Sequence, residues 1–263
     1  MSAVADEKGT GGGSPFEPRS ADRWQIWRAQ TSLELRLSLR HGESLLLTFG
    51  IPILLLVFFS LVDILPTGTD EPIDFLFPGI LALAIMSTSF VATAIATGFE
   101  RESGVLKRLG STPLSRADLI AAKTGAIVSV QAIQLVVFTA IALVLGFRFA
   151  GPDSALALVA VALGTVAFTG LGMLMAGTLP AITTLAAANG AYLLLVLSSG
   201  MLFSTDELPG PMAAVSQLLP SGALADLLHG TVGQADLNNT AWLVLAAWAV
   251  AAPAAAARWF RWT

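Results

Sequence analysis

The chain of 263 residues is 55% hydrophobic and only 12% charged, with a mean hydropathy of +0.75, which excludes an ordinary soluble domain. It contains no cysteine, so neither a disulfide framework nor a thiolate metal site can form. The net charge is −4 and no basic face of a folded soluble domain is evident, so we expect no nucleic-acid partner.

The N-terminal region is predicted to lie before the membrane-spanning helices. Residues 1–20 are rich in Gly, Ser and Pro and are expected to form a disordered cytoplasmic tail, without the apolar core of a cleavable signal. Residues 21–43 contain Trp24, Trp27 and several arginines, among them Arg28, which favours an amphipathic helix in the membrane interface. The leucines of this segment alternate with a period of two, so a soluble or irregular lead-in remains an alternative.

Long uncharged runs predict six membrane-spanning helices. About 20 apolar residues in a helix cross a bilayer core about 30 Å thick, and lipid offers no partner for backbone polar groups, so each run should be helical. The predicted spans cover residues 44–64, 75–98, 119–147, 154–177, 181–204 and 237–257, within a transmembrane domain at residues 44–257. The predicted fold class is therefore all-α, an integral membrane protein.

The segment before the sixth predicted span, residues 207–230, is interrupted by Pro209, Pro211 and Pro220. Its pieces are too short to cross a bilayer. We therefore expect one or two small external helices resting on the outer membrane surface. After the sixth span, residues 258–263 form the C-terminal segment.

The positive charges predict the orientation of the bundle. All of the 14 lysines and arginines except Arg148 fall on one side of the predicted spans, whereas the connections on the other side are mostly acidic. The positive-inside rule assigns the basic side to the cytoplasm. The sequence thus predicts a multi-pass protein of the cell inner (cytoplasmic) membrane, with both termini in the cytoplasm.

Motifs for catalysis and nucleotide binding are missing from the sequence. The centres of the predicted spans carry no charge, which disfavours the proton relays of many carriers. The chain has no GxxxxGK[ST] loop for nucleotide phosphates and no HExxH motif. His41 and His229 are predicted on opposite sides of the membrane, each as a surface histidine, which excludes a shared metal site. We expect no enzymatic activity, no metal and no cofactor on this chain.

Polar uncharged residues inside the spans are further candidates for function. Gln131 and Gln134 in the third span are expected to form interhelical hydrogen bonds. The possible substrate pathway in the fifth span consists of Asn189, Tyr192, Ser198 and Ser199. Hydrogen bonding between helices is the alternative role for these four residues.

Charge is concentrated between the second and third spans, from Glu100 to Asp118. Residues 100–110 can form a helix, since the acidic residues come early and the basic residues late, as the helix dipole favours. Gly110 can end this helix, and Ser115 can cap the third span. A charged helix joined to two spans can pass force from a cytoplasmic partner to the membrane, or it can be only a positive-inside anchor.

The stretch "FERESGVLKRLGSTPLSRADLIAAK" resembles the loop "ERExGTLkrLxxTPLsr" of ABC type-2 exporter permeases, of the daunorubicin-resistance-permease type. The amphipathic lead-in, the six spans and the short external helices before the sixth are similar to the layout of that family. The positions that match the loop are Glu100, Arg101, Glu102, Gly104, Leu106, Lys107, Arg108, Leu109, Pro113 and Leu114. The chain departs from the pattern at Ser103 and Val105, and its external "ALADLLHG" lacks the usual Arg.

This resemblance implies that residues 100–110 are a coupling helix that docks on a separate ABC ATPase subunit, which binds the ATP and Mg. It also implies that two permease chains, identical or related, pair in the lipid bilayer. The expected function is then efflux of a hydrophobic or amphipathic, drug-like or lipid-like molecule, with antibiotic resistance as one outcome. The alternative is an ATPase-independent carrier, channel or assembly scaffold.

Overall fold

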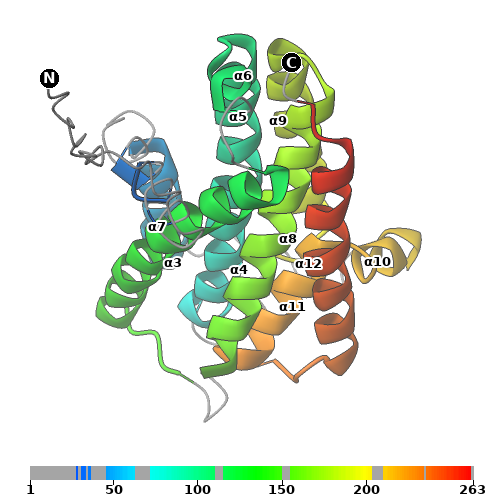
Figure 1. The fold of residues 1–263 in the computed structure, drawn as a ribbon. Coiled ribbons are helices and arrows are strands. Elements are labelled where there is room, and N and C mark those ends of the chain that lie inside the picture. Colours follow the sequence, from blue (N-terminus) through cyan, green and yellow to red (C-terminus); the bar gives the residue numbers. More distant parts are fainter. Residues whose placement is uncertain are drawn as a thin grey trace, which may run out of the picture.

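The computed structural model describes residues 28, 31–33, 35–36, 46–62, 72–109, 115–149, 155–202, 210–233 and 235–261. Throughout these parts of the chain the regular elements are helices, as the sequence predicts (Figure 1). They are η1 (Leu46–Gly50), α3 (Ile51–Leu61), α4 (Pro72–Met86), η2 (Ser87–Ala92), α5 (Thr93–Glu102), α6 (Val105–Leu109), α7 (Arg116–Val144), α8 (Leu156–Thr178), α9 (Ala181–Leu197), α10 (Gly210–Ser216), α11 (Pro220–Thr231) and α12 (Asn239–Trp259).

Apolar helices occupy all six predicted spans. Four helices in the described residues are long and apolar enough to cross a membrane: Pro72–Glu102, Arg116–Val144, Leu156–Thr178 and Asn239–Trp259. Two shorter apolar helices, Thr48–Leu61 and Ala181–Leu197, fall on the first and fifth predicted spans. The prediction of an all-helical membrane protein is therefore confirmed, while the count of six crossings stays a prediction.

The two ends of the bundle differ in charge. α6 and the last residues of α12 lie at the same end, where Leu106, Leu119 and Phe260 join one buried cluster (Figure 1). Apart from Arg28 and Arg36 of the N-terminal segment, the described cations of this basic end are Arg101, Lys107, Arg108, Arg116, Lys123, Arg258 and Arg261. The charged residues described at the opposite, mostly acidic end are Asp74, Arg148, Asp226 and Asp236.

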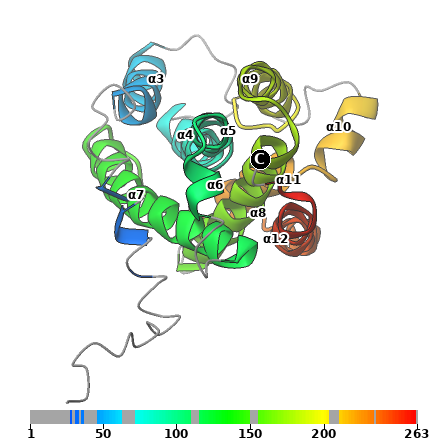
Figure 2. The ribbon, with the colours of Figure 1, turned by 45° about the horizontal axis from the view of Figure 1, so that its top comes forward.

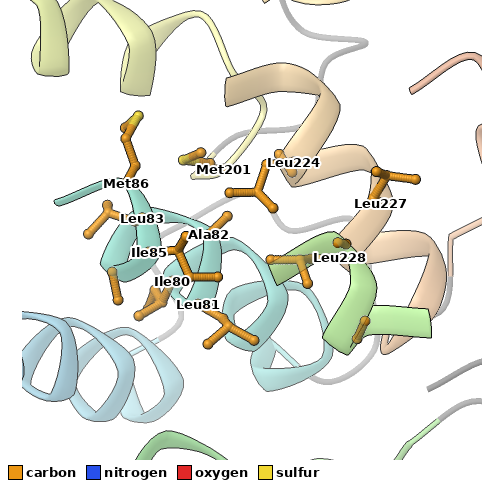
Figure 3. Close-up of a cluster of buried hydrophobic side chains, with 14 of the residues drawn as sticks. Ile80, Leu81, Ala82, Leu83, Ile85, Met86, Met201, Leu224, Leu227 and Leu228 are labelled. Carbon is orange, nitrogen blue, oxygen red and sulfur yellow. The ribbon is translucent and has the colours of Figure 1, made fainter. Parts of the chain in front are cut away.

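The core of the bundle forms where α4 meets α11. Ile80 and Met86 of α4 belong to one buried cluster with Met201 and with Leu224 of α11 (Figure 3). Gly79 lets the segment that follows α9 approach α4, because a Cβ atom at that position would lie 1.9 Å from the carbonyl oxygen of Met201. At this point the backbone of α4 therefore packs directly against the backbone of that segment.

The helix α11 is buried, which corrects the prediction that residues 207–230 form helices resting on the outer surface. It packs against α4, α8 and α12, and nearly all of its residues are buried. Gly222 lets the end of α10 approach closely, because a Cβ atom there would lie 2.2 Å from the carbonyl oxygen of Ser216. A segment too short to cross the membrane is thus part of the core.

The connection between α10 and α11 lies deep along the bundle. Trp248, near the middle of α12, donates its indole N–H to the carbonyl oxygen of Leu218 at 3.0 Å. The short α10 projects from the side of the bundle, with exposed Met212 and Val215 (Figures 1 and 2). Together α10 and α11 form an inserted pair of helices that begins beside the middle of α12.

Gln131 and Gln134 hold helices together, which confirms the prediction of interhelical hydrogen bonds. Gln131 donates to Ser89 Oγ of η2 at 2.6 Å and accepts a hydrogen bond from Thr165 of α8. Gln134 donates to the carbonyl oxygen of Thr48 in η1 at 3.2 Å. These bonds connect α7 to three neighbouring elements inside the apolar bundle.

Candidate functional site

The charged loop folds as a helical hairpin, α5 followed by α6, at the basic end. The sequence predicts one helix over residues 100–110, but the structure ends α5 at Glu102 and begins α6 at Val105. Gly104 has φ +77°, in the left-handed region that favours glycine, and its N–H donates to the carbonyl oxygen of Arg101 at 3.1 Å. Glycine at position 104 therefore explains why the helix is interrupted here. After the interruption α6 runs in a different direction from α5.

Leu106 fixes α6 to the rest of the bundle. Its side chain is fully buried in a cluster with Leu119 of α7, Met173 of α8 and Phe260 after α12. Phe260 packs so closely on α8 that a Cβ atom on Gly177 would lie 2.4 Å from its ring. Leu106 thus packs α6 into the same buried cluster as residues of α7, α8 and the end of α12.

Glu100 forms an ion pair inside the chain. The nitrogen of Lys123, on α7, lies 2.9 Å from a carboxylate oxygen of Glu100, and the two side chains are 6% and 26% exposed, respectively. The pair ties the end of α5 to α7. Sequence reasoning counted Lys123 only as a positive-inside charge, although a lysine two turns into an apolar helix is a signal that it needs an acidic partner.

Arg101 also binds within the chain. Its guanidinium donates a hydrogen bond to the carbonyl oxygen of Leu179, in the turn between α8 and α9. The resemblance to the family loop placed Glu100 and Arg101 in the docking motif without saying which way they face. In the structure both side chains bind within the same chain, Glu100 to α7 and Arg101 to the turn between α8 and α9.

The remaining residues of the hairpin form an exposed surface. This α6 outer face consists of Glu102, Ser103, Val105, Lys107 and Arg108. Val105 is 43% exposed, although it is apolar and lies among charged side chains. The hairpin thus has a buried inner side, held by Leu106, and an exposed outer side of mixed charge.

Several residues of the predicted sites lie outside the described parts of the chain: Gly110, Pro113, Leu114, Trp24, Trp27 and His41. Arg28 lies among the described residues; its backbone is helical and its side chain is exposed. Nearby, Thr31 donates to the carbonyl oxygen of Ala122 at 3.4 Å, so this segment lies beside the start of α7. The prediction of an interfacial helix over residues 21–43 stays untested.

The four residues of the predicted substrate pathway do not share a cavity in the described structure. Asn189 is exposed and donates to Leu185 O at 2.8 Å within its own helix. Tyr192 is half-buried and hydrogen-bonds with the side chain of Ser87. Ser198 and Ser199 are buried and donate to carbonyl oxygens of their own segment. Of the four, Ser198 alone lines the groove described next.

Sequence reasoning missed an apolar groove between α8, α9 and α10. Its volume is about 870 Å³, and its lining includes Phe90 of η2, Met175 of α8, Leu195 of α9 and Met212 of α10. Figure 2 shows α9 and α10 on the same side of α8. Because the walls of the groove come from three separate helices and η2, no local sequence pattern predicts it.

His229 is buried in α11, so the prediction of a surface histidine was wrong. Its Nδ1 lies 2.8 Å from the carbonyl oxygen of Ala225, and its Nε2 lies 3.1 Å from that of Phe75. Burial lowers the pKa of His229 below its ordinary value of 6.5, against the opposing effects of the two carbonyl groups and the neighbouring Asp226. Burial likewise raises the pKa of Asp226, which accepts a hydrogen bond from Asn238 at 3.0 Å.

We expect acid to weaken the packing of α11 through His229. The folded state favours the neutral ring, so the free energy of unfolding should fall as the pH drops below about 6.5. Asp226 acts in the opposite direction, because its raised pKa favours the protonated, folded form in acid. Thermal unfolding of the purified chain in detergent between pH 7.5 and 5.5 measures the combined effect of His229 and Asp226 on stability. His229→Gln should remove most of the loss of stability at the lower pH. Equal pH dependence in both proteins would contradict this prediction.

The sequence was compared with models of known protein families, and one family matches most of the chain. The family of the ABC-2 type transporter matches residues 26–231, which include the hairpin of α5 and α6 and the buried α11. A search of curated proteins found no match to the chain. The family match covers more than half of the sequence. The chain belongs to the ABC-2 type transporter family, as a membrane permease subunit.

Proposed function

We propose that this chain is the permease of an ATP-driven exporter whose ATPase is a separate polypeptide that docks on the α6 outer face. The observation that carries the proposal is the two-sided hairpin: charged and exposed outside, and fixed by the fully buried Leu106 inside. The family match supports it, since α5 and α6 fall within the matched residues. ATP and Mg would bind to the partner, because the sequence has no phosphate-binding loop of its own.

The contacts of the hairpin supply a path for force. A partner that pushes on α6 moves Leu106 against α7, α8 and Phe260. The ion pair of Glu100 with Lys123 and the hydrogen bond from Arg101 to Leu179 connect the end of α5 to α7 and to the turn before α9. A closely packed interior transmits such a displacement with little loss.

The charge-free centres of the spans favour a hydrophobic or amphipathic substrate, drug-like or lipid-like, moved outward across the cytoplasmic membrane. In this proposal the basic end faces the cytoplasm, as the positive-inside rule favours. A second permease chain, identical or related, completes the pathway. Efflux and antibiotic resistance belong to the same proposal.

The alternative, an ATPase-independent carrier, channel or scaffold, is separated from this proposal by reconstitution. The purified chain would be placed in vesicles with and without a candidate ABC ATPase, and export of fluorescent lipid and drug probes would be followed. The proposal expects export only with the ATPase and ATP, and none when the ATPase carries an inactivating substitution. Equal movement of a probe without any ATPase would support the alternative.

A further inference from the structure

The apolar groove between α8, α9 and α10 runs toward the basic end of the bundle. Thr178 and Leu179, at the end of α8, line it there, and Leu219, before α11, lines its deeper part. Since Leu218 contacts the middle of α12, the groove extends from mid-bundle to the basic end. A groove that begins beside the middle of the bundle and ends at its basic end would lie in one leaflet of a membrane that contains these helices.

The polar side chains that line the groove already have hydrogen-bond partners within the protein, so they do not require a polar ligand. The hydroxyl of Thr178 donates to Leu174 O at 2.8 Å, and the hydroxyl of Ser198 donates to Leu194 O at 2.8 Å. Both bonds stay within the helix that carries the hydroxyl. The rest of the named lining is hydrocarbon or thioether side chains, so the part of a ligand that enters the groove must be apolar.

Two arginines, Arg101 and Arg261, lie beside lining residues at the basic end of the groove. Arg101 binds the carbonyl oxygen of Leu179, a lining residue, and a guanidinium has five N–H donors, so it can hold a further oxygen at the same time. Arg261 donates its backbone N–H to Gly177 O at 3.1 Å, next to the lining residue Thr178. At the same end of the bundle Trp259, the last residue of α12, is 59% exposed, and an exposed tryptophan there is of the kind that lies at headgroup depth. The nearby carboxylate of Glu100 is paired with Lys123, on α7.

We propose that this groove binds an anionic phospholipid, with an acyl chain between α8 and α9 and the phosphate at Arg101 and Arg261. The inference requires only that the chain lies in a membrane, and it stands whether or not an ATPase docks on α6. Bilayer tails are as apolar as the groove, so the acyl chain alone gives no preference over bulk lipid. Selection must come from the headgroup, and binding should therefore depend on headgroup charge.

The test is native mass spectrometry of the purified full-length chain titrated with phosphatidylglycerol or phosphatidylcholine of identical acyl chains. We expect tighter binding of phosphatidylglycerol to the wild-type chain. Arg261→Gln should weaken it about fivefold, the effect of losing one cation near an anionic headgroup. Its matched control, Arg148→Gln, removes an exposed cation from the opposite end and should leave binding unchanged.

A second pair of variants tests the groove itself. Ala191→Trp fills the groove from α9 and should abolish the preference for phosphatidylglycerol, whereas Val136→Trp, on the exposed face of α7, should preserve it. If Ala191→Trp does not fold, Leu195→Phe fills the same space more mildly and should weaken binding in the same direction. Equal binding of both lipids by the wild-type chain, or equal binding by the groove-filling and control variants, would overturn the proposal.

Discussion

The double variant Val105→Asp, Lys107→Glu is expected to lose co-purification with its ABC ATPase while keeping the fold of the permease. Both side chains belong to the exposed α6 outer face, and neither belongs to the buried cluster around Leu106. An aspartate in the first turn of α6 suits the helix dipole, so α6 itself should persist. Lys107→Glu reverses a charge and Val105→Asp adds one, so an ATPase surface complementary to Lys107 would meet like charges, which costs several kcal/mol and lowers affinity by about a hundredfold or more.

The measurement is affinity capture of co-expressed candidate ABC ATPases, together with the ATPase activity of the captured complex. Arg148→Glu is the matched control, because it reverses an exposed charge at the opposite end of the bundle. Thermal unfolding of the isolated permease verifies that both variants fold. An undiminished complex with the double variant would show that the outer face of α6 is not the docking surface.

Breaking the ion pair of Glu100 and Lys123 is expected to destabilise the permease itself. Glu100→Gln leaves the 6% exposed ammonium group of Lys123 without its carboxylate, whereas Lys123→Met leaves a carboxylate that is 26% exposed. Removing one partner of a fully buried pair costs about 3–5 kcal/mol, and the partial exposure of Glu100 lowers this to about 2–4 kcal/mol. The Gln variant should therefore be less stable than the Met variant.

A double-mutant cycle, measured as the free energy of unfolding in detergent, isolates the interaction energy of Glu100 with Lys123 from the other effects of each substitution. The combined variant Glu100→Gln, Lys123→Met removes both charges and should recover most of the stability lost by Glu100→Gln alone. Strict additivity of the two single changes would mean that the side chains do not interact. This result would also remove one of the connections through which α5 moves α7.

The sequence predicted what depends on composition and local chemistry. Uncharged runs identify the helices, and Ser115 caps α7 as expected, accepting a hydrogen bond from the N–H of Asp118 at 3.1 Å. Gln131 was predicted to bond between helices because a buried amide in an apolar bundle must find a partner, and it bonds to Ser89 and Thr165.

The features that sequence reasoning missed depend on packing between distant segments. The loop motif names Glu100 and Arg101 but does not say which side of the hairpin they occupy, and their partners lie on α7 and in the turn after α8. The segment of α11 is too short to cross, and its burial depends on a glycine of a distant helix: a Cβ atom on Gly164 of α8 would lie 3.0 Å from the side chain of Leu224. The groove beside α9 likewise exists only once separate helices come together.

The most direct test of the account is a cross-link from α6 to the ATPase. Because the chain contains no cysteine, Val105→Cys and Arg148→Cys each create a single reactive site, one on the α6 outer face and one at the opposite end. With a short cysteine-reactive photo-crosslinker, we expect a covalent adduct with the ATPase from position 105 alone. No adduct from position 105 in an active complex, or an adduct from position 148 instead, would contradict it.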